Sequence, residues 1–160
     1  MKKVLLSVIL VLGAMVSMAQ MASVIKFPQL QAMMKQNNDT TYVFNFWATW
    51  CAPCVEEFPN FQKISDATSK NKVKVIFISL DFKKDLNKSL NPFLKNHNVT
   101  NSVYLLDELD YNSWIDKVDK DWNGDLPATL VINNKTGVYK LYPHPFTLDQ
   151  LQQTLKPYIN

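Results

Sequence analysis

The sequence predicts an α/β fold: one domain with a mixed central β-sheet flanked by helices on both faces. Two patterns support this class. Runs of β-branched and aromatic residues alternate with segments of helical periodicity, which is typical of parallel strands joined by helical crossovers. The chain then ends with a hairpin and a helix, which adds antiparallel strands. Its 160 residues, 47% of them hydrophobic, suit a single buried core.

The first elements follow from local patterns. Residues 23–27 alternate weakly and predict a short strand. Residues 28–36 predict a short helix, with Pro28 in its first turn, where a missing N–H costs nothing. Residues 41–47, "TYVFNFW", have the β-branched and aromatic composition of a central strand.

A longer helix is expected from about Ala52. Phe58, Phe61 and Ile64 recur at helical spacing and would share its buried face. Pro59 lies inside this helix and is expected to kink it, because proline removes one backbone hydrogen bond.

The middle of the chain continues the alternation. Residues 72–82 predict a second buried strand, and residues 86–96 a helix interrupted near Pro92. Residues 103–106 could form a further strand, and residues 111–117 a short helix.

The closing hairpin pairs residues 127–133 with residues 137–142 across an Asn-Asn-Lys-Thr-Gly turn. Thr147 then precedes a final amphipathic segment, residues 148–159, and is expected to cap it as a helix.

Residues 1–19 predict a signal peptide, leaving one domain over residues 20–160. Lys2 and Lys3 precede an apolar run, and small residues end the segment at Ala19. The alternative is a retained N-terminal membrane anchor, but the run is shorter than the roughly 20 residues that span a bilayer. Cleavage after Ala19 would place the protein in the periplasm or cell envelope, and loss of both lysines lowers the formal charge from +3 to +1.

The only two cysteines, Cys51 and Cys54, form a Cys-x-x-Cys pair, which admits several chemistries. A structural disulfide would close a very small loop and stabilise little. Zinc needs four ligands, and the only histidines, His97 and His144, lie far off in polar sequence, so no metal site is expected. Haem attachment needs a histidine where Val55 stands.

A redox role fits the local pattern better. The predicted strand 41–47 leads into a turn that opens a helix, with Cys51 at the opening. Unpaired N–H groups and the helix dipole favour a thiolate there. Cys51 would be the exposed nucleophile. Cys54, one turn further in, would be the shielded thiol that resolves a mixed disulfide.

The stretch "NFWATWCAPC" followed by "VEEFP", together with the later "LPATLVIN", resembles the TlpA/ResA-type exported thiol–disulfide oxidoreductases of the thioredoxin fold. The resemblance runs from about Thr41 to the last helix. It implies a thioredoxin fold with a cis peptide bond before Pro127. It also implies that Leu126 and Pro127 hold an extended substrate chain beside the cysteines. Trp50, next to the nucleophile, is expected to shape the rim of this substrate-binding site.

Two acidic positions distinguish this chain from thioredoxins. Asn45 stands six residues before Cys51, where thioredoxins carry a buried aspartate, so that acid–base group is missing. Glu57 lies about one helical turn after Cys54, and ResA-type proteins bear a glutamate there that assists proton transfer. From the residues alone, Glu56 and Glu57 could equally be solvated charges near a helix start. The resemblance favours a catalytic role for Glu57.

The direction of the chemistry is predicted from the two residues between the cysteines. Ala52 and Pro53 offer neither a side-chain charge nor a side-chain donor, so the thiolate lacks the extra stabilisation that makes a strong oxidant. A protein-disulfide reductase is therefore favoured. The alternatives are an oxidase or isomerase using the same residues, and a copper-binding metallochaperone. A peroxiredoxin is disfavoured, because the proline and threonine that precede its reactive cysteine are not at their spacing.

A protein-disulfide reductase requires a protein substrate and an electron donor. The expected substrates are disulfide-containing exported proteins, by resemblance in cytochrome c maturation or envelope redox homeostasis. An upstream thiol electron donor, membrane-bound by the same resemblance, is required because no flavin or nicotinamide motif is present, and no cofactor is expected. All 17 basic residues are lysines, so arginine forks for phosphate are absent and nucleic acid is not an expected partner. Monomers are common for this fold.

Overall fold

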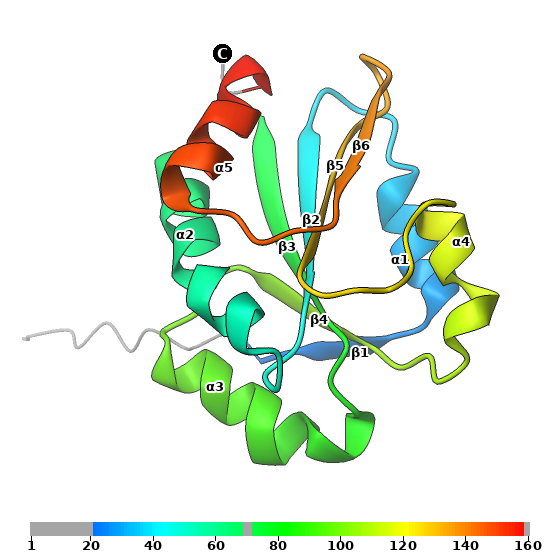
Figure 1. The fold of residues 1–160 in the computed structure, drawn as a ribbon, viewed down its shortest axis with the longest axis vertical. Helices are drawn as coiled ribbons and strands as arrows, with labels where there is room; N and C mark the ends of the chain where they lie inside the picture. Colours follow the sequence, from blue (N-terminus) through cyan, green and yellow to red (C-terminus); the bar gives the residue numbers. More distant parts are fainter. Residues whose placement is uncertain (1–20, 69–71, 159–160) are drawn as a thin grey trace, which may run out of the picture.

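The computed structural model describes residues 21–68 and 72–158, and Figure 1 shows their arrangement. The predicted signal peptide, residues 1–19, lies outside the described residues. Among the residues described, no helix is both long enough and apolar enough to cross a membrane.

One mixed sheet of six strands organises the described part of the chain, in the spatial order β1-β4-β3-β2-β5-β6. The strands β1 to β4 run parallel, and β5 and β6 join beside β2 as an antiparallel hairpin. The bounds are β1 Ser23–Ile25, β2 Thr41–Trp47, β3 Val73–Ser79, β4 Ser102–Leu106, β5 Ala128–Asn133 and β6 Val138–Tyr142. The predicted α/β class with a mixed sheet is confirmed.

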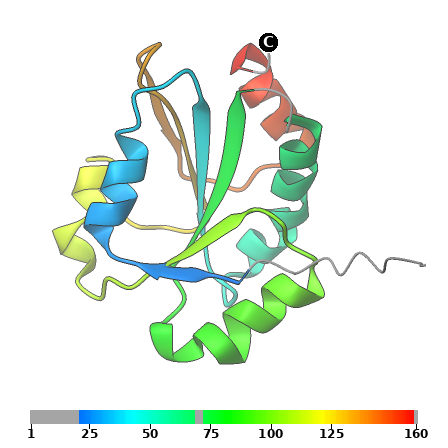
Figure 2. The same cartoon turned by 180° about the vertical axis from the view of Figure 1, so that it is seen from behind.

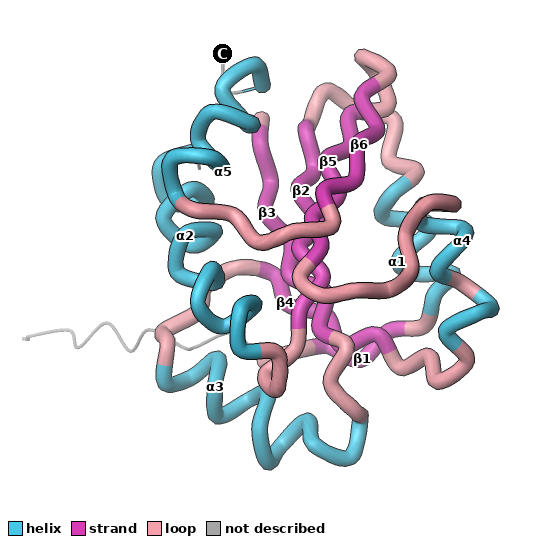
Figure 3. Tube along the Cα trace, in the orientation of Figure 1, coloured by secondary structure: helices cyan, strands magenta, loops and turns pink. Residues whose placement is uncertain are grey.

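Helices cover both faces of the sheet, as Figures 2 and 3 show. The α2 and α5 helices pack on one face, with α3 at its lower end, and α1 and α4 pack on the other. The bounds are α1 Phe27–Met34, α2 Ala52–Thr68, α3 Asn91–Asn96, α4 Ile115–Val118 and α5 Leu148–Leu155. Thr147 caps α5 as predicted, its side chain accepting a hydrogen bond from Gln150 N.

The central strand β2 divides the core, because successive side chains of a strand point to opposite faces. Val43 and Trp47 pack with the α2 side, whereas Phe44 and Phe46 pack with the α1 side. The predicted helical stripe, Phe58, Phe61 and Ile64, is fully buried. The α2 helix runs on through Pro59 without interruption.

Three predicted elements differ in detail. The strand expected to reach residue 82 ends at Ser79, whose hydroxyl donates a hydrogen bond to Asp81 two residues further on. The helix expected over residues 86–96 is a π-helical turn, Leu86–Leu90, followed by α3 with Pro92 in its first turn. Residues 111–117 divide into a 3₁₀ turn and α4. These departures are short elements whose form depends on packing rather than on local pattern.

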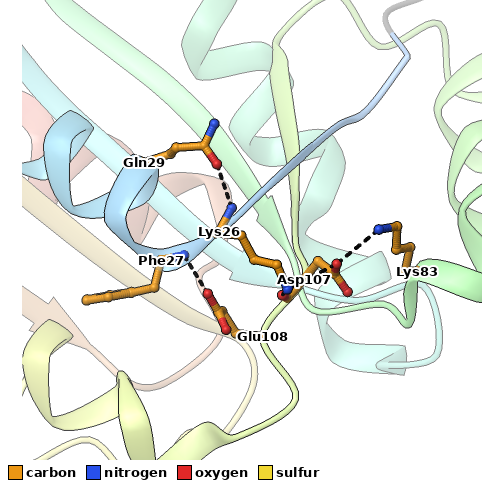
Figure 4. Close-up of polar contacts among 6 residues, drawn as sticks. All are labelled: Lys26, Phe27, Gln29, Lys83, Asp107 and Glu108. Atoms are coloured by element: carbon orange, nitrogen blue, oxygen red, sulfur yellow. Dashed lines mark hydrogen bonds and ion pairs between the residues drawn. The ribbon is translucent and has the colours of Figure 1, made fainter.

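The carboxyl-terminal ends of β1 and β4 are tied together by polar contacts, shown in Figure 4. Asp107, which follows β4, is paired with Lys26 and Lys83, each at 3.2 Å. Both lysines hold the pKa of Asp107 below its usual range, chiefly through their hydrogen bonds. Glu108 accepts a 2.9 Å hydrogen bond from Phe27 N at the start of α1. This edge of the sheet, where β2 and β3 also end, carries the cysteines.

Candidate functional site

The two cysteines lie where β2 passes into α2, and they are joined by a disulfide with an S–S distance of 2.07 Å. Cys51 precedes the first residue of α2, and Cys54 lies in its first turn. Cys51 was expected to be exposed, which is wrong for the oxidised form, because only 7% of its surface is accessible. Cys54 is completely buried, so Cys51 is still the more accessible of the two sulfur-bearing residues.

Backbone hydrogen bonds fix Cys51 at the opening of the helix. Cys51 N donates to Ala48 O at 3.1 Å, which closes the turn between β2 and α2. Cys51 O accepts from Val55 N at 3.1 Å, as in the first turn of a helix. The N–H groups of such a first turn have no partners within the helix and favour negative charge beside them. A thiolate on Cys51 would benefit from this position.

Glu57 is buried, with 2% of its surface accessible, so it is not a solvated charge. Its Oε1 accepts a 2.9 Å hydrogen bond from Asn45 Nδ2 on β2. Its Oε2 accepts a 2.6 Å hydrogen bond from Phe146 N, in the loop before α5. The neighbouring Glu56 is exposed, so the two glutamates have entirely different environments.

Burial raises the pKa of Glu57 above its ordinary value of 4.5. The hydrogen bonds from Phe146 N and Asn45, and the charge of His144, oppose this shift but do not outweigh the loss of hydration. A carboxyl group with a raised pKa can hold and release a proton closer to neutral pH, as acid–base chemistry at thiols requires.

Asn45 connects Glu57 to the sheet. Besides Glu57, its Nδ2 donates to Thr129 Oγ1 on β5 at 3.2 Å. Its Oδ1 is buried and has no partner among the residues that the structure describes. From the sequence, Asn45 counts only as a missing acid, but in the structure its side chain donates a hydrogen bond from β2 to the carboxyl of Glu57 on α2.

The Leu126–Pro127 peptide bond is cis, as the resemblance implied. Pro127 is buried and precedes β5, whose first residue, Ala128, pairs with Phe46 near the end of β2. The proline thus lies at the edge of the sheet from which the cysteine loop departs. Leu126 is partly buried against both core clusters.

The tryptophans divide into one surface and three core residues. Trp50 is 61% exposed, as expected for the rim of a site. Trp47 packs against Phe58 with ring centroids 4.5 Å apart. Trp114 and Trp122 are both buried and pack against each other on the α1 side of the sheet.

A cavity of about 380 Å³ opens beside the start of α2. Its lining comes from the first half of α2 and the loop before α5: Pro53, Glu56, Glu57, Asn60, Pro145, Phe146, Thr147 and Leu148. Glu57 therefore lies between the core and a space large enough for a side chain of another polypeptide. Over residues 21–68 and 72–158, no group of three His, Cys, Asp or Glu side chains is placed to hold a metal ion.

Sequence reasoning missed the residues that hold this centre in place. Phe146 acts through its backbone N–H, which leaves no mark in the residue type. Asp81 lies two residues after the end of β3, and its side chain accepts hydrogen bonds from the loop that carries Cys51. An acid at the end of an apolar strand segment was a usable signal, since functional groups gather at the carboxyl ends of strands in α/β sheets.

The model of the AhpC/TSA family matches residues 26–140, well over half of the chain. Sporulation thiol-disulfide oxidoreductase A of Bacillus subtilis is 25% identical over 118 residues, which cover 73% of this chain and 67% of that protein. Thiol-disulfide oxidoreductase ResA of Oceanobacillus iheyensis is 27% identical over 110 residues, 69% of this chain and 53% of that protein. The chain thus spans about half the length of the ResA relative.

Solved structures agree on the fold. A thioredoxin-related protein from Neisseria meningitidis superposes with a TM-score of 0.64 at 24% identity, covering 78% of this chain and 89% of that one. StoA from Bacillus subtilis superposes with a TM-score of 0.54 at 25% identity, covering 73% of this chain and 83% of that one. The described residues therefore have a thioredoxin-like fold.

Proposed function

This chain belongs to the AhpC/TSA family, and we propose that it is an exported reductase of protein disulfides. Its Cys51–Cys54 pair is the redox centre of a thioredoxin-like thiol–disulfide oxidoreductase. The observation that carries the proposal is the position of this pair: a disulfide at the start of α2, one turn from the buried carboxyl of Glu57.

In the proposed reaction, the Cys51 thiolate attacks one sulfur of a substrate disulfide. A mixed disulfide forms, and the other substrate sulfur leaves as a thiolate that takes up a proton. Cys54 then loses its proton and attacks Cys51, which releases the second substrate thiol and forms the Cys51–Cys54 disulfide. The substrate gains two electrons and two protons, and the enzyme loses them.

Glu57 supports the second half of this sequence. It lies three residues after Cys54 and so about one turn along the same helix. The buried thiol of Cys54 needs a base before it can attack, and the raised pKa of Glu57 makes its carboxylate a better proton acceptor than an exposed one. Glu57 would return the proton when a thiol donor reduces the disulfide again.

The direction of electron flow depends on how strongly the surroundings of Cys51 stabilise its thiolate. Ala52 and Pro53 supply no charge and no side-chain donor to Cys51, and Pro53 also lacks an N–H. The thiolate is then stabilised mainly by the helix terminus. Oxidants of the DsbA kind owe their strength to an unusually stable reduced form, so a thiolate with less support favours a reductase.

The proposed substrates are exported proteins with disulfides, held as an extended chain by Trp50, Leu126 and Pro127. Candidate substrates are apocytochrome c, copper-site proteins and misoxidised envelope proteins, as the resemblance to ResA-type proteins implies. An upstream thiol donor, bound to the membrane, would regenerate the dithiol. The protein would act as a monomer in the periplasm or cell envelope.

The test is the reduction potential of the Cys51–Cys54 couple, measured by equilibration with glutathione, together with insulin reduction in the presence of dithiothreitol. We expect a potential near that of thioredoxin, about −270 mV, and catalysed insulin reduction. A potential near that of DsbA, about −120 mV, would overturn the reductase in favour of an oxidase. Stoichiometric Cu(I) binding without disulfide exchange would favour a metallochaperone.

A further inference from the structure

Asp81 lies two residues after the end of β3 and is buried, with 4% of its surface accessible. Both of its carboxylate oxygens accept from Thr49 N, at 3.2 and 3.1 Å. Its Oδ1 also accepts from Thr49 Oγ1 at 2.5 Å, and its Oδ2 accepts from Ser79 Oγ at 2.7 Å. The end of β3 therefore supports this carboxylate, and the carboxylate in turn holds Thr49.

Thr49 belongs to the loop that carries the nucleophile. The loop leaves β2 at Trp47, whose carbonyl accepts a 2.8 Å hydrogen bond from Leu80 N. It closes where Cys51 N donates to Ala48 O at 3.1 Å. Thr49 lies between these two points, so its bonds to Asp81 fix the middle of a segment whose two ends are already fixed.

The hydrogen bonds between Asp81 and Thr49 are strong because their acceptor is a carboxylate. Hydrogen bonds to a carboxylate are shorter and about twice as strong as bonds between neutral groups, and burial keeps water from competing with them. A neutral side chain at position 81 could not accept from three donors at once. The buried carboxylate of Asp81 therefore binds the loop through Thr49.

We propose that Asp81 is a positioning residue for disulfide exchange: through Thr49, its carboxylate holds Cys51 at the N-terminal end of α2. This inference rests on the proposed function, because it assigns Asp81 to the same reaction. When the Cys51 sulfur is held at the helix terminus, its thiolate is stabilised and it is placed to attack a substrate disulfide. If the loop could move, both the stabilisation of the thiolate and the geometry of attack would be lost.

Two substitutions test the proposal in the fully reduced protein. Asp81→Asn keeps the size of the side chain but replaces one acceptor oxygen by an NH₂ group, which faces the donors of the loop. Thr49→Val removes the hydroxyl bond without changing any charge, at a partly exposed position that tolerates it. Asp107→Asn is the matched control, since it removes a carboxylate that bonds Lys26 and Lys83 at the same edge of the sheet.

The readouts are the rate of exchange with a model disulfide and the ultraviolet thiolate absorbance at neutral pH. We expect Asp81→Asn to slow exchange roughly tenfold, in line with small misplacements of reacting groups, and to decrease the thiolate signal. Thr49→Val should show a smaller loss of the same sign, and Asp107→Asn should change neither readout. If Asp81→Asn does not fold, Thr49→Val decides alone.

The sign of the thiolate signal separates the explanations. Removing a nearby negative charge would by itself increase the thiolate, so an increase in Asp81→Asn with no effect in Thr49→Val overturns positioning. Lower thermal stability with both readouts unchanged per folded molecule also overturns it. A wild type without exchange activity would instead refute the proposed function, while the thiolate signal still tests the hold on Cys51.

Discussion

Asn45 Nδ2 donates a 2.9 Å hydrogen bond to Glu57 Oε1, and both side chains are buried. One residue comes from the central strand and the other from the helix that carries the cysteines. Asn45 lies six residues before Cys51, so in this chain the strand contributes a neutral hydrogen-bond donor and the helix contributes the acid. The predictions about acid–base chemistry follow from this pair.

Glu57→Gln should slow disulfide exchange while preserving the fold, because glutamine can still accept from Phe146 N but cannot take a proton. A general acid–base group typically contributes ~10²–10⁴-fold, and we expect a loss toward the lower end for a group that assists the thiols. The measurement is the steady-state rate of insulin reduction. Glu56→Gln is the control, since Glu56 is exposed one position away. Equal and negligible effects of both substitutions would remove Glu57 from the mechanism.

The stability of the protein should also depend on pH through Glu57. Its pKa in the folded state is raised above the ordinary 4.5, so the folded state binds this proton more tightly than the unfolded state does. The contribution of Glu57 is therefore fully present below the unfolded pKa and is lost as pH rises from there through the folded pKa. Glu57→Gln should gain stability relative to the wild type over this window.

Denaturant unfolding of the oxidised protein, followed from about pH 4 upward, measures this difference. Glu56→Gln should show a nearly constant difference from the wild type over the same range. A wild type that becomes more stable relative to Glu57→Gln as pH rises would contradict the raised pKa.

The pattern of the sequence was enough to predict the order of elements and the cysteine pair, because both are local. Residues 41–47 form the central strand at the predicted bounds, and Phe58, Phe61 and Ile64 are buried together. The environment of Glu57 was not predictable from local pattern, since its burial depends on Phe146, 89 residues away. The contact of Asp81 with Thr49 spans 32 residues and was missed for the same reason.

Trp50→Ala should weaken substrate binding without affecting the fold. Trp50 is 61% exposed beside Cys51, so its removal leaves no cavity in the core, and stability should stay within about 0.5 kcal/mol of the wild type. Aromatic residues that anchor a protein contact can contribute about 2 kcal/mol to its binding free energy. The KM for a protein disulfide should therefore rise by roughly tenfold, with kcat little changed.

Met21→Ala is the matched control for Trp50. Met21 is 63% exposed, just before β1, at the opposite end of the parallel strands from the cysteines. An equal rise in KM for both variants, or an unchanged KM for Trp50→Ala, would remove Trp50 from the substrate site.

Export predicts a defined mature N-terminus. If the segment that ends at Ala19 is a cleaved signal, the protein isolated from its native compartment should begin at Gln20. Mass analysis of its N-terminal peptide is the measurement. A peptide that retains Met1, recovered with the membrane fraction, would instead indicate an anchor.

The division of labour between the cysteines gives the last prediction, and it also identifies substrates. Cys54→Ala removes the resolving thiol but leaves Cys51 free to attack, so mixed disulfides with exported proteins should accumulate in the native compartment. Cys51→Ala should capture few or none, because Cys54 is completely buried. Non-reducing electrophoresis followed by mass spectrometry of the complexes measures both, and dithiothreitol should release the partners. Capture by Cys51→Ala but not by Cys54→Ala would reverse the two roles, and capture by neither would argue against exchange through a mixed disulfide.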